Sequence, residues 1–336
     1  MTSDRPVVEV EGLTVHFRRG GRLRGGVQTV RAVEDVSFAI GAGETLALAG
    51  ESGSGKSTVA RTMLRIADPT AGRIRVAGKD VAGLRGAALK AYRRTMQMVY
   101  QDPYDSLDPR MKIGATVEEA LLVRGVRAAD RPALVAELLG RVGLPAAYAT
   151  RYPHELSGGQ RQRVSIARAL GVDPAVIVCD EAVSALDVSV RAQVLNLLRD
   201  LQDQSGLAYL FISHDLSTLR FIADRVAIMY LGRLVEVGSR DEVFSRPVHP
   251  YTQALLAAVP EPVARRRGAG PRVRLSGEPP SPINPPTGCP FHPRCPLAQD
   301  VCRRERPALV RKAGGQLGAC HLVPDAEPSR KEALPA

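Results

Sequence analysis

One short segment of the sequence has the composition of a phosphate-binding loop. Residues 50–57 fit the spacing G-x-x-x-x-G-K-[ST] and lie between a predicted strand at 45–49 and a predicted helix at about 56–66. Backbone N–H groups of such a loop can face an anion, and the helix N-terminus adds its positive dipole end. Lys56 can neutralise β- and γ-phosphates, and the Ser57 hydroxyl can ligate Mg²⁺. The predicted nucleotide-binding residues are Gly50, Glu51, Ser52, Gly53, Ser54, Gly55, Lys56, Ser57 and Thr58.

Two adjacent acids follow a second buried strand. The predicted strand at 175–179 leads into Asp180 and Glu181. A carboxylate at the C-terminal end of a strand beside a phosphate loop is placed to hold the metal, so Asp180 is the expected Mg²⁺ partner, through water. Glu181 then faces the γ-phosphate and can polarise an attacking water. For Glu181 taken by itself, a helix cap is an equally good interpretation.

A second helix start that could bind an anion lies at 156–163, which reads Leu-Ser-Gly-Gly-Gln-Arg-Gln-Arg. Ser157 is predicted as the N-cap and Gln160 as its capping-box partner, so the helix begins with exposed backbone N–H groups. Two anion sites on opposite sides of one domain cannot grip the same γ-phosphate. The pattern therefore implies a partner chain.

Together, these three segments resemble the ABC family of ATPases. The resemblance implies that two nucleotide domains dimerise head to tail, with ATP and Mg²⁺ between the phosphate loop of one subunit and the helix start of the other. Gln101 resembles the residue that senses Mg²⁺ and the attacking water, 184–187 the loop that crosses the dimer interface, and His214 the switch histidine, although a lone histidine at a strand end is usually structural. The residues assigned to the partner's ATP are Leu156, Ser157, Gly158, Gly159 and Gln160.

The adenine site is less directly indicated. The family stacks an aromatic ring on adenine at a set spacing before the phosphate loop, and here that spacing points to Val27. Because the Gly/Arg-rich stretch at 18–26 displaces the register, Phe17 is the expected stacking residue.

The elements around these motifs predict an α/β, doubly wound core with an antiparallel edge layer. A helical subdomain is expected at about 102–156, with helix starts at Thr116, through a capping box with Glu119, and at Asp130. The resemblance makes this an ABC-type P-loop ATPase core, with an antiparallel β subdomain, over residues 1–246. Other predicted strands occupy 7–17, 30–40, 72–78, 96–100 and 207–212, with a helix at 188–204 and a hairpin at 225–237.

The composition changes after residue 246, where most of the 25 prolines lie. We expect neither ordinary helix nor sheet in this C-terminal extension, 247–336, beyond a helix-like piece at 251–259. Its four cysteines, in a segment without a core of its own, suggest a metal staple, since a reducing compartment disfavours disulfides. The resemblance implies a [4Fe–4S] cluster, while zinc and an unmetallated tail stay open. The proposed ligands are Cys289, Cys295, Cys302 and Cys320; His292 and His321 are more simply bystanders, and Cys179 a core residue.

Residues 101–110, 246–253 and the Cys/Pro-rich end resemble the ATP-binding subunits of oligopeptide/dipeptide importers, and Asp-Pro-Tyr after Gln101 is most similar to their F-type ATPase. Nickel and some sugar importers share this tail. The resemblance implies a sister ATPase subunit, two permease subunits, and an extracytoplasmic peptide-binding protein. The helical subdomain would meet a short helix of the permease, and the chain would lie peripherally on the cytoplasmic face of the inner membrane.

Composition argues against other classes of function. The net charge is +11 and its excess is concentrated after residue 260, but only 4% of residues are aromatic and there is no Trp, so nucleic acid is not the expected partner. No apolar run approaches the roughly 18 residues of a spanning helix, and the N-terminus lacks a secretory pattern. The competing hypothesis is a soluble ABC ATPase of DNA repair or translation with a zinc-binding tail. Such proteins usually carry two nucleotide domains, whereas this sequence has one phosphate loop.

Overall fold

The computed structural model describes residues 5–20, 28–101, 106–258 and 277–326. Two sheets form its centre. The strands of the smaller sheet are β1 (Val8–Arg19), β2 (Gln28–Ile40), β4 (Ala71–Val76) and β5 (Lys79–Asp80). Those of the larger are β3 (Thr45–Ala49), β6 (Met96–Val99), β7 (Val176–Asp180), β8 (Ala208–Ile212), β9 (Arg225–Tyr230), β10 (Arg233–Ser239), β11 (Val310–Arg311) and β12 (Leu317–Gly318).

The strand order gives the topology that the motifs require. The larger sheet runs β11-β12-β10-β9-β3-β8-β7-β6, and the smaller β2-β1-β4-β5. Strands β9, β3, β8, β7 and β6 are parallel to one another, while β10 pairs antiparallel with β9. The carboxyl ends of β3, β7 and β8 therefore meet at one edge, as the ligand sites of open α/β sheets do.

Residues of the central strands alternate between two cores. In β3, Leu46 and Leu48 pack with the smaller sheet and α1 (Lys56–Met63), whereas Ala47 and Ala49 belong to the core under the other helices. Both faces are covered, which explains why the strand reads as an unbroken apolar run instead of alternating with polar residues.

Helices α1, α5 (Arg131–Arg141), α6 (Gly158–Gly171), α7 (Val188–Ser205) and α10 (Pro250–Ala257) lie where the sequence predicts helices, whereas α8 (Leu216–Ile222), α9 (Arg240–Ser245) and α11 (Asp300–Arg304) had no predicted counterpart. Helix α2 (Gly86–Thr95) also had no predicted counterpart, and the expected helix start at Thr116 is wrong. Helix α4 (Ile113–Arg124) begins after Lys112, and the Thr116 hydroxyl donates to the Lys112 carbonyl within the helix. Asp130 is confirmed as the N-cap of α5. Short 3-10 turns lie at Ala146–Thr150, Pro153–Glu155 and His292–Arg294.

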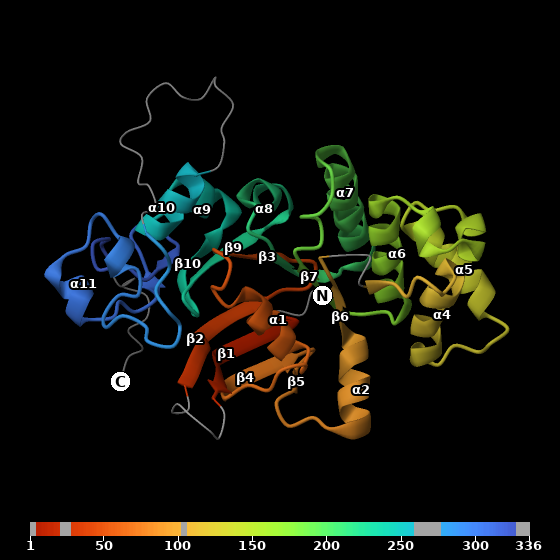
Figure 1. Ribbon diagram of the computed structural model, residues 1–336, viewed down its shortest axis with the longest axis horizontal. Coiled ribbons are helices and arrows are strands. Elements are labelled where there is room, and N and C mark those ends of the chain that lie inside the picture. The colour runs from red at the N-terminus through yellow and green to blue at the C-terminus, as the bar shows by residue number, and fades with distance from the viewer. Residues whose placement is uncertain (1–4, 21–27, 102–105, 259–276, 327–336) are drawn as a thin grey trace, which may run out of the picture.

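The expectation that the proline-rich segment forms no sheet is wrong. Strand β12 pairs antiparallel with β10, placing Gly318 opposite Glu236 and Leu317 opposite Val237. Phe291 is buried in the main core. The two-residue strands need few backbone donors, so the prolines can occupy the turns between them. The segment after residue 276 thus lies beside β10, at the end of the molecule opposite α4 and α5 (Figure 1).

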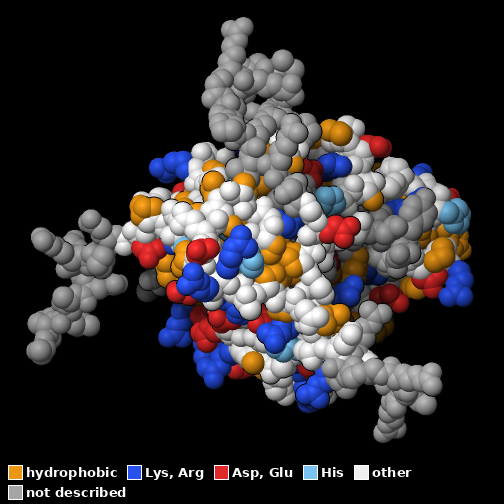
Figure 2. All heavy atoms as spheres, turned by 60° about the vertical axis from the view of Figure 1, so that its left-hand side comes forward, with side chains coloured by type: hydrophobic (Ala, Val, Ile, Leu, Met, Phe, Trp, Pro, Cys, Tyr) orange, Lys and Arg blue, Asp and Glu red, His pale blue; other side chains and the backbone are white. Residues whose placement is uncertain are grey.

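The surface carries interspersed charges. On the face seen in Figure 2, Lys and Arg side chains lie among Asp and Glu side chains and apolar patches. No helix in the described part of the chain is both long enough and apolar enough to cross a membrane.

Candidate nucleotide site

A pocket of about 560 Å³ lies at the carboxyl edge of the parallel strands. It joins the phosphate loop to residues that follow β6, β7 and β8, together with one residue of the C-terminal segment. Its lining is Val30, Ala32, Ser52, Gly53, Gly55, Lys56, Ser57, Thr58, Gln101, Glu181, His214 and Pro282.

The phosphate loop curls around the Lys56 ammonium. Nζ donates to the carbonyls of Gly50 (2.7 Å) and Glu51 (2.9 Å). Burial lowers the pKa of Lys56, and the carboxylates of Glu181 and Asp180 oppose that shift. A buried ammonium facing carbonyl dipoles is ready to exchange them for the stronger charge of phosphate oxygens.

Gly55, the N-cap of α1, shows why this loop needs glycine. Its φ is +107°, and a Cβ there would lie 2.3 Å from the Ala32 carbonyl oxygen on β2. A side chain would be strained by this backbone conformation and would collide with the neighbouring strand.

Ser57 and Asp180 lie together, as the sequence predicts. The Ser57 hydroxyl donates to Asp180 Oδ1 at 3.1 Å. Burial raises the pKa of Asp180, the Ser57 hydrogen bond lowers it, and the neighbouring Glu181 raises it further. A divalent cation would relieve the repulsion between the two carboxylates, and a hydroxyl beside a carboxylate is an oxygen donor pair of the kind Mg²⁺ takes. The residues present therefore fit a magnesium ion.

Glu181 and His214 contact each other at the far wall. Glu181 Oε1 accepts from the His214 backbone N–H (3.1 Å) and lies 2.7 Å from His214 Nδ1. Glu181 Oε2 is buried and has no hydrogen-bond partner among the described residues. The Glu181 backbone has a φ of +53°, a costly conformation for a residue with a side chain. The chain thus holds one carboxylate oxygen in place and leaves the other for a further donor, such as a water molecule.

The other predicted residues are distributed as follows. Gln101 is exposed and lines the pocket. Phe17 does not line it: it pairs across the strands with Val30, which does, and is 45% exposed. Val27, residues 102–105, Val259 and the arginines at 265–267 lie outside the described residues.

The helix start at 156–160 lies apart from this pocket. Ser157 is the N-cap of α6, its hydroxyl accepts from the Gln160 N–H (3.3 Å), and the reciprocal capping-box bond is present. A Cβ on Gly159 would lie 2.2 Å from Val190 Cγ1 of α7, so glycine permits the close packing of these helices. None of the residues 156–160 lines the pocket. In the loop 184–187, the Ser184 hydroxyl donates to the Glu181 carbonyl (2.9 Å).

The four cysteines of the C-terminal segment lie near one another. Burial raises the pKa of Cys289 to about 11, and the other three thiols add to the shift. Burial likewise raises the pKa of Cys295 and of Cys320. Across the described ranges, however, no group of three or more His, Cys, Asp or Glu is arranged to hold a metal ion. Cys179 is fully buried in the core, as expected.

Sequence reasoning missed the pocket's apolar side and the support of its loop. Val30, Ala32 and Pro282 form that side, and Tyr251 and Arg294 both bond to Glu51. Val30 and Ala32 share the predicted β2 strand with no special motif, and the other three are far from the loop in sequence. No spacing rule pointed to them.

The fold and the pocket define a nucleotide-binding P-loop ATPase. Residues 33–184 match the ABC transporter family, and residues 235–302 the C-terminal region of oligopeptide/dipeptide transporters. A dimeric, post-hydrolysis ATP-binding cassette bound to ADP and Pi is similar in structure, with a TM-score of 0.61 at 27% identity, covering 69% of this chain and 98% of that one.

Two curated relatives match nearly the whole chain. A "Probable peptide ABC transporter ATP-binding protein" of Sinorhizobium fredii is 55% identical, over 94% of this chain and 90% of that protein. The oligopeptide transport ATP-binding protein AppF of Bacillus subtilis is 48% identical, over 94% and 97%. The chain belongs to the family of peptide ABC transporter ATP-binding proteins, whose members are ATP hydrolases. The soluble DNA-repair or translation ATPase receives no support from these relatives.

Proposed function

We propose that this chain hydrolyses ATP at Glu181 to power the import of di- or oligopeptides through a membrane permease. The observation that carries the catalytic part is the convergence of Lys56, Ser57–Asp180, and Glu181–His214 on one pocket. The peptide cargo is supported by the relatives' printed functions and by the match to the oligopeptide/dipeptide transporter C-terminal region.

Each residue has a role that its surroundings support. Lys56 and the loop hold the phosphates, and Ser57 and Asp180 hold Mg²⁺, whose charge would stabilise the transferred phosphoryl group. Glu181 Oε2 accepts a proton from the attacking water, while His214 fixes Oε1. Gln101 lies at the pocket edge, where it can contact both the metal and the water. Phe17 or the apolar side formed by Val30 and Pro282 would pack on the base.

The second half of the site comes from another chain. Residues 156–160 present a capped helix start that lies outside their own chain's pocket. We propose that they meet the γ-phosphate held by a sister ATPase, in a head-to-tail pair. The dimeric form of the similar cassette supports such pairing.

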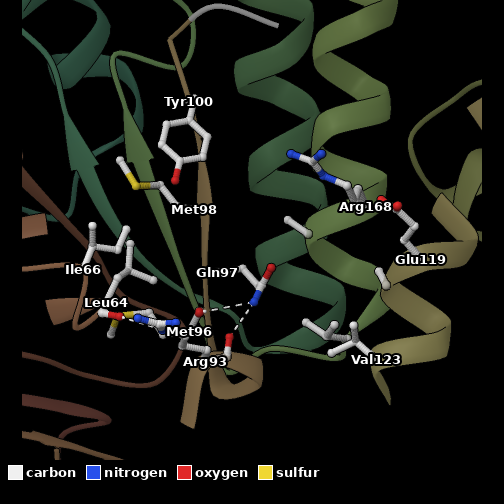
Figure 3. A pocket seen from close by; sticks show the side chains of 13 residues that line it. Leu64, Ile66, Arg93, Met96, Gln97, Met98, Tyr100, Glu119, Val123 and Arg168 are labelled. Atoms are coloured by element: carbon white, nitrogen blue, oxygen red, sulfur yellow. Dashed lines mark hydrogen bonds between the residues drawn. The ribbon is translucent and has the colours of Figure 1, made fainter. Parts of the chain in front are cut away.

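A groove between the sheet and the helical subdomain suits a permease helix. Figure 3 shows its two sides: Ile66, Met98 and Tyr100 face Val123 and Arg168 across a cavity of about 360 Å³. Three of its apolar side chains are exposed: Ile66 by 56%, Tyr100 by 42% and Val123 by 56%. An amphipathic helix can lay its apolar face into such a groove. We propose that a helix of one of two permease subunits docks here, which would hold the chain on the cytoplasmic face of the inner membrane, with a peptide-binding protein on the other side.

We further propose the division into a nucleotide-binding domain, 1–246, with a helical subdomain at 102–156, and a C-terminal extension, 247–336.

In the extension, the clustered thiols would hold a [4Fe–4S] group, with zinc as the alternative. Either group would have to displace the thiol protons that burial favours. Iron, sulfide and zinc analysis of anaerobically purified protein tests this. Four irons per chain support the cluster, one zinc per chain selects the alternative, and neither metal rejects both.

The transport function is tested in liposomes that contain the chain, its sister ATPase and the permease. Peptide-loaded binding protein should stimulate ATP hydrolysis and peptide uptake. Val123→Asp, in the groove, should abolish this stimulation and release the chain from the membranes, because a carboxylate there must be desolvated on docking. Leu297→Asp is the matched control, since Leu297 is an apolar residue of similar exposure (50%, against 56% for Val123) at the other end of the molecule. Stimulation by a non-peptide cargo alone would refute peptide import.

A further inference from the structure

A buried arginine of the C-terminal segment contacts the phosphate loop. Arg294 Nη1 donates to Glu51 Oε2 at 2.6 Å, and Nη2 donates to Glu51 Oε1 at 3.0 Å. The two residues are 243 positions apart. The arginine side chain is only 5% exposed and the glutamate side chain 25%. The hydrogen bonds to Glu51 raise the pKa of Arg294. Two parallel charge-assisted bonds fix the orientation of the carboxylate as well as its position.

A second contact holds the backbone of the same loop residue. The Glu51 N–H donates to Tyr251 Oη at 2.9 Å, and Tyr251 is fully buried. The side chain and the backbone of Glu51 are therefore both held by residues that follow the last long strand, β10.

Glu51 passes this constraint to the lysine that meets phosphate. Its carbonyl accepts from Lys56 Nζ at 2.9 Å, beside the Gly50 carbonyl at 2.7 Å. Turning the Glu51 peptide would move an acceptor away from the ammonium and change the curl of the loop. Glu51 thus bonds to both Arg294 and Lys56 and links them directly.

Arg294 is itself held rigidly. Its backbone N–H donates to the Phe291 carbonyl (3.0 Å), closing the turn His292–Arg294. Phe291 is 1% exposed. The centre of its ring lies 5.3 Å from the ring centre of Tyr230 and 5.4 Å from that of Tyr251. The arginine and the tyrosine that hold Glu51 thus belong to one packed cluster, so they act on the loop as a unit.

We propose that Arg294 is a positioning residue for the phosphate loop, through which the C-terminal segment sets the affinity of the site for ATP. This rests on the proposed role of Lys56. The segment would then be a functional part of the nucleotide site in addition to its place in the core.

The test compares Arg294→Gln with Arg303→Gln, which alters an exposed arginine of the same segment. With Mg²⁺-ATP as the probe, Arg294→Gln should raise both the Kd and the KM about tenfold, while kcat changes little. A loss of ATP affinity of this size is expected when a buried charged pair is broken. Arg303→Gln should match the wild type. A purely structural role would instead lower the melting temperature and the active fraction, and leave the Kd of the folded protein unchanged.

Two further variants keep the inference falsifiable if Arg294→Gln folds poorly. Arg294→Lys keeps the charge but loses the two-pronged geometry and should give part of the Kd increase. In the double variant Glu51→Gln/Arg294→Gln, the effects should not add, because both act through one pair. Additive effects, or a wild-type Kd in Arg294→Lys, would overturn the inference. Lys56→Ala separates this inference from the proposed function. If Lys56→Ala binds ATP normally, the proposed function fails. If Lys56→Ala loses ATP binding while Arg294→Lys keeps the wild-type Kd, only this inference fails.

Discussion

At the scale of single residues, the two carboxylate oxygens of Glu181 have different surroundings. One carboxylate oxygen is bonded twice by His214, and the other is buried with no partner among the described residues. A buried acceptor without a donor costs free energy in the folded state. The strained backbone at Glu181 adds to that cost. Both costs fit the proposed role of Glu181, in which the carboxylate must be held in position opposite the phosphate loop.

Glu181→Gln is the direct test of that role. The amide keeps the shape and can still bond to His214, but it cannot accept a proton. ATP binding should persist while kcat falls about 10²–10⁴-fold, the usual contribution of a general base. ATP affinity and single-turnover hydrolysis measure the two effects. Turnover at the wild-type rate would remove Glu181 from the reaction.

At the scale of elements, helix starts decide much of the function. The same device, a serine N-cap in a capping box, begins both α6 at Ser157 and α9 at Ser239. Only the first has the adjacent Gly158 and Gly159 that let another molecule or helix approach closely. The capping box stabilises the start of both helices, and the two helix starts differ in the residues that surround the cap.

Ser157→Ala should therefore weaken ATP-dependent pairing more than it weakens folding. Loss of the cap costs about 1 kcal/mol of stability, and loss of the hydroxyl removes the donor proposed for the partner's phosphate. In the Glu181→Gln background, sedimentation or size-exclusion should show less ATP-induced dimer. Ser239→Ala carries the same local cost and should pair normally. Equal loss of dimer in both variants would argue against a specific role for 156–160.

The cap of α10 gives stability a pH dependence. His249 is 1% exposed, its Nδ1 accepts from the Tyr251 N–H (3.1 Å), and burial lowers the pKa of His249 to about 3. The unfolded chain, with a histidine pKa near 6.5, binds a proton below that pH, whereas the folded chain does not until about pH 3. This contribution to stability is complete above pH 6.5 and is lost as the pH falls toward 3.

His249→Asn isolates this effect. Asparagine can still cap the helix but does not titrate. Between pH 6.5 and 4 the wild type should lose up to about 1.4 kcal/mol per pH unit relative to the variant, as thermal or urea unfolding would show. Burial raises the pKa of the neighbouring Glu236, which acts in the opposite direction, but both proteins retain it. Parallel pH profiles would show that His249 titrates normally in the fold.

At the scale of the whole molecule, the C-terminal segment is built into the ATPase core. β12 extends the main sheet at β10, and Phe291 joins the aromatic cluster behind the phosphate loop. Residues 96–98 of β6 and Tyr100 line the exposed apolar groove, and Gln101, the next residue, lines the nucleotide pocket.

Phe291→Ala measures how strongly the segment is integrated. Removing a buried ring should destabilise the protein by about 3–5 kcal/mol. Unfolding should remain a single transition at a lower denaturant midpoint, because the segment and the sheet share one core. An unchanged main transition, with a separate early one, would show that the segment folds independently.

The sequence alone determined the chemistry that is local along the chain. The phosphate loop, the acid pair after β7, and the capped start of α6 each lie within a few residues, so strand, turn and cap preferences were enough to predict them. The start of α4 was misjudged because Thr116 has the residue type of a cap but bonds back inside the helix. The helix α2 has no cap or phosphate motif to draw attention to it.

Tertiary structure alone decided what meets across long separations. The Arg294–Glu51 pair, the Tyr251 contact, Pro282 in the pocket, and β12 on β10 join residues with no shared periodicity or spacing. A short-range motif can be predicted from the sequence because its residues are close together along the chain. A long-range contact exists only after the sheet and its cores have packed, when a buried charge or ring must find a partner nearby.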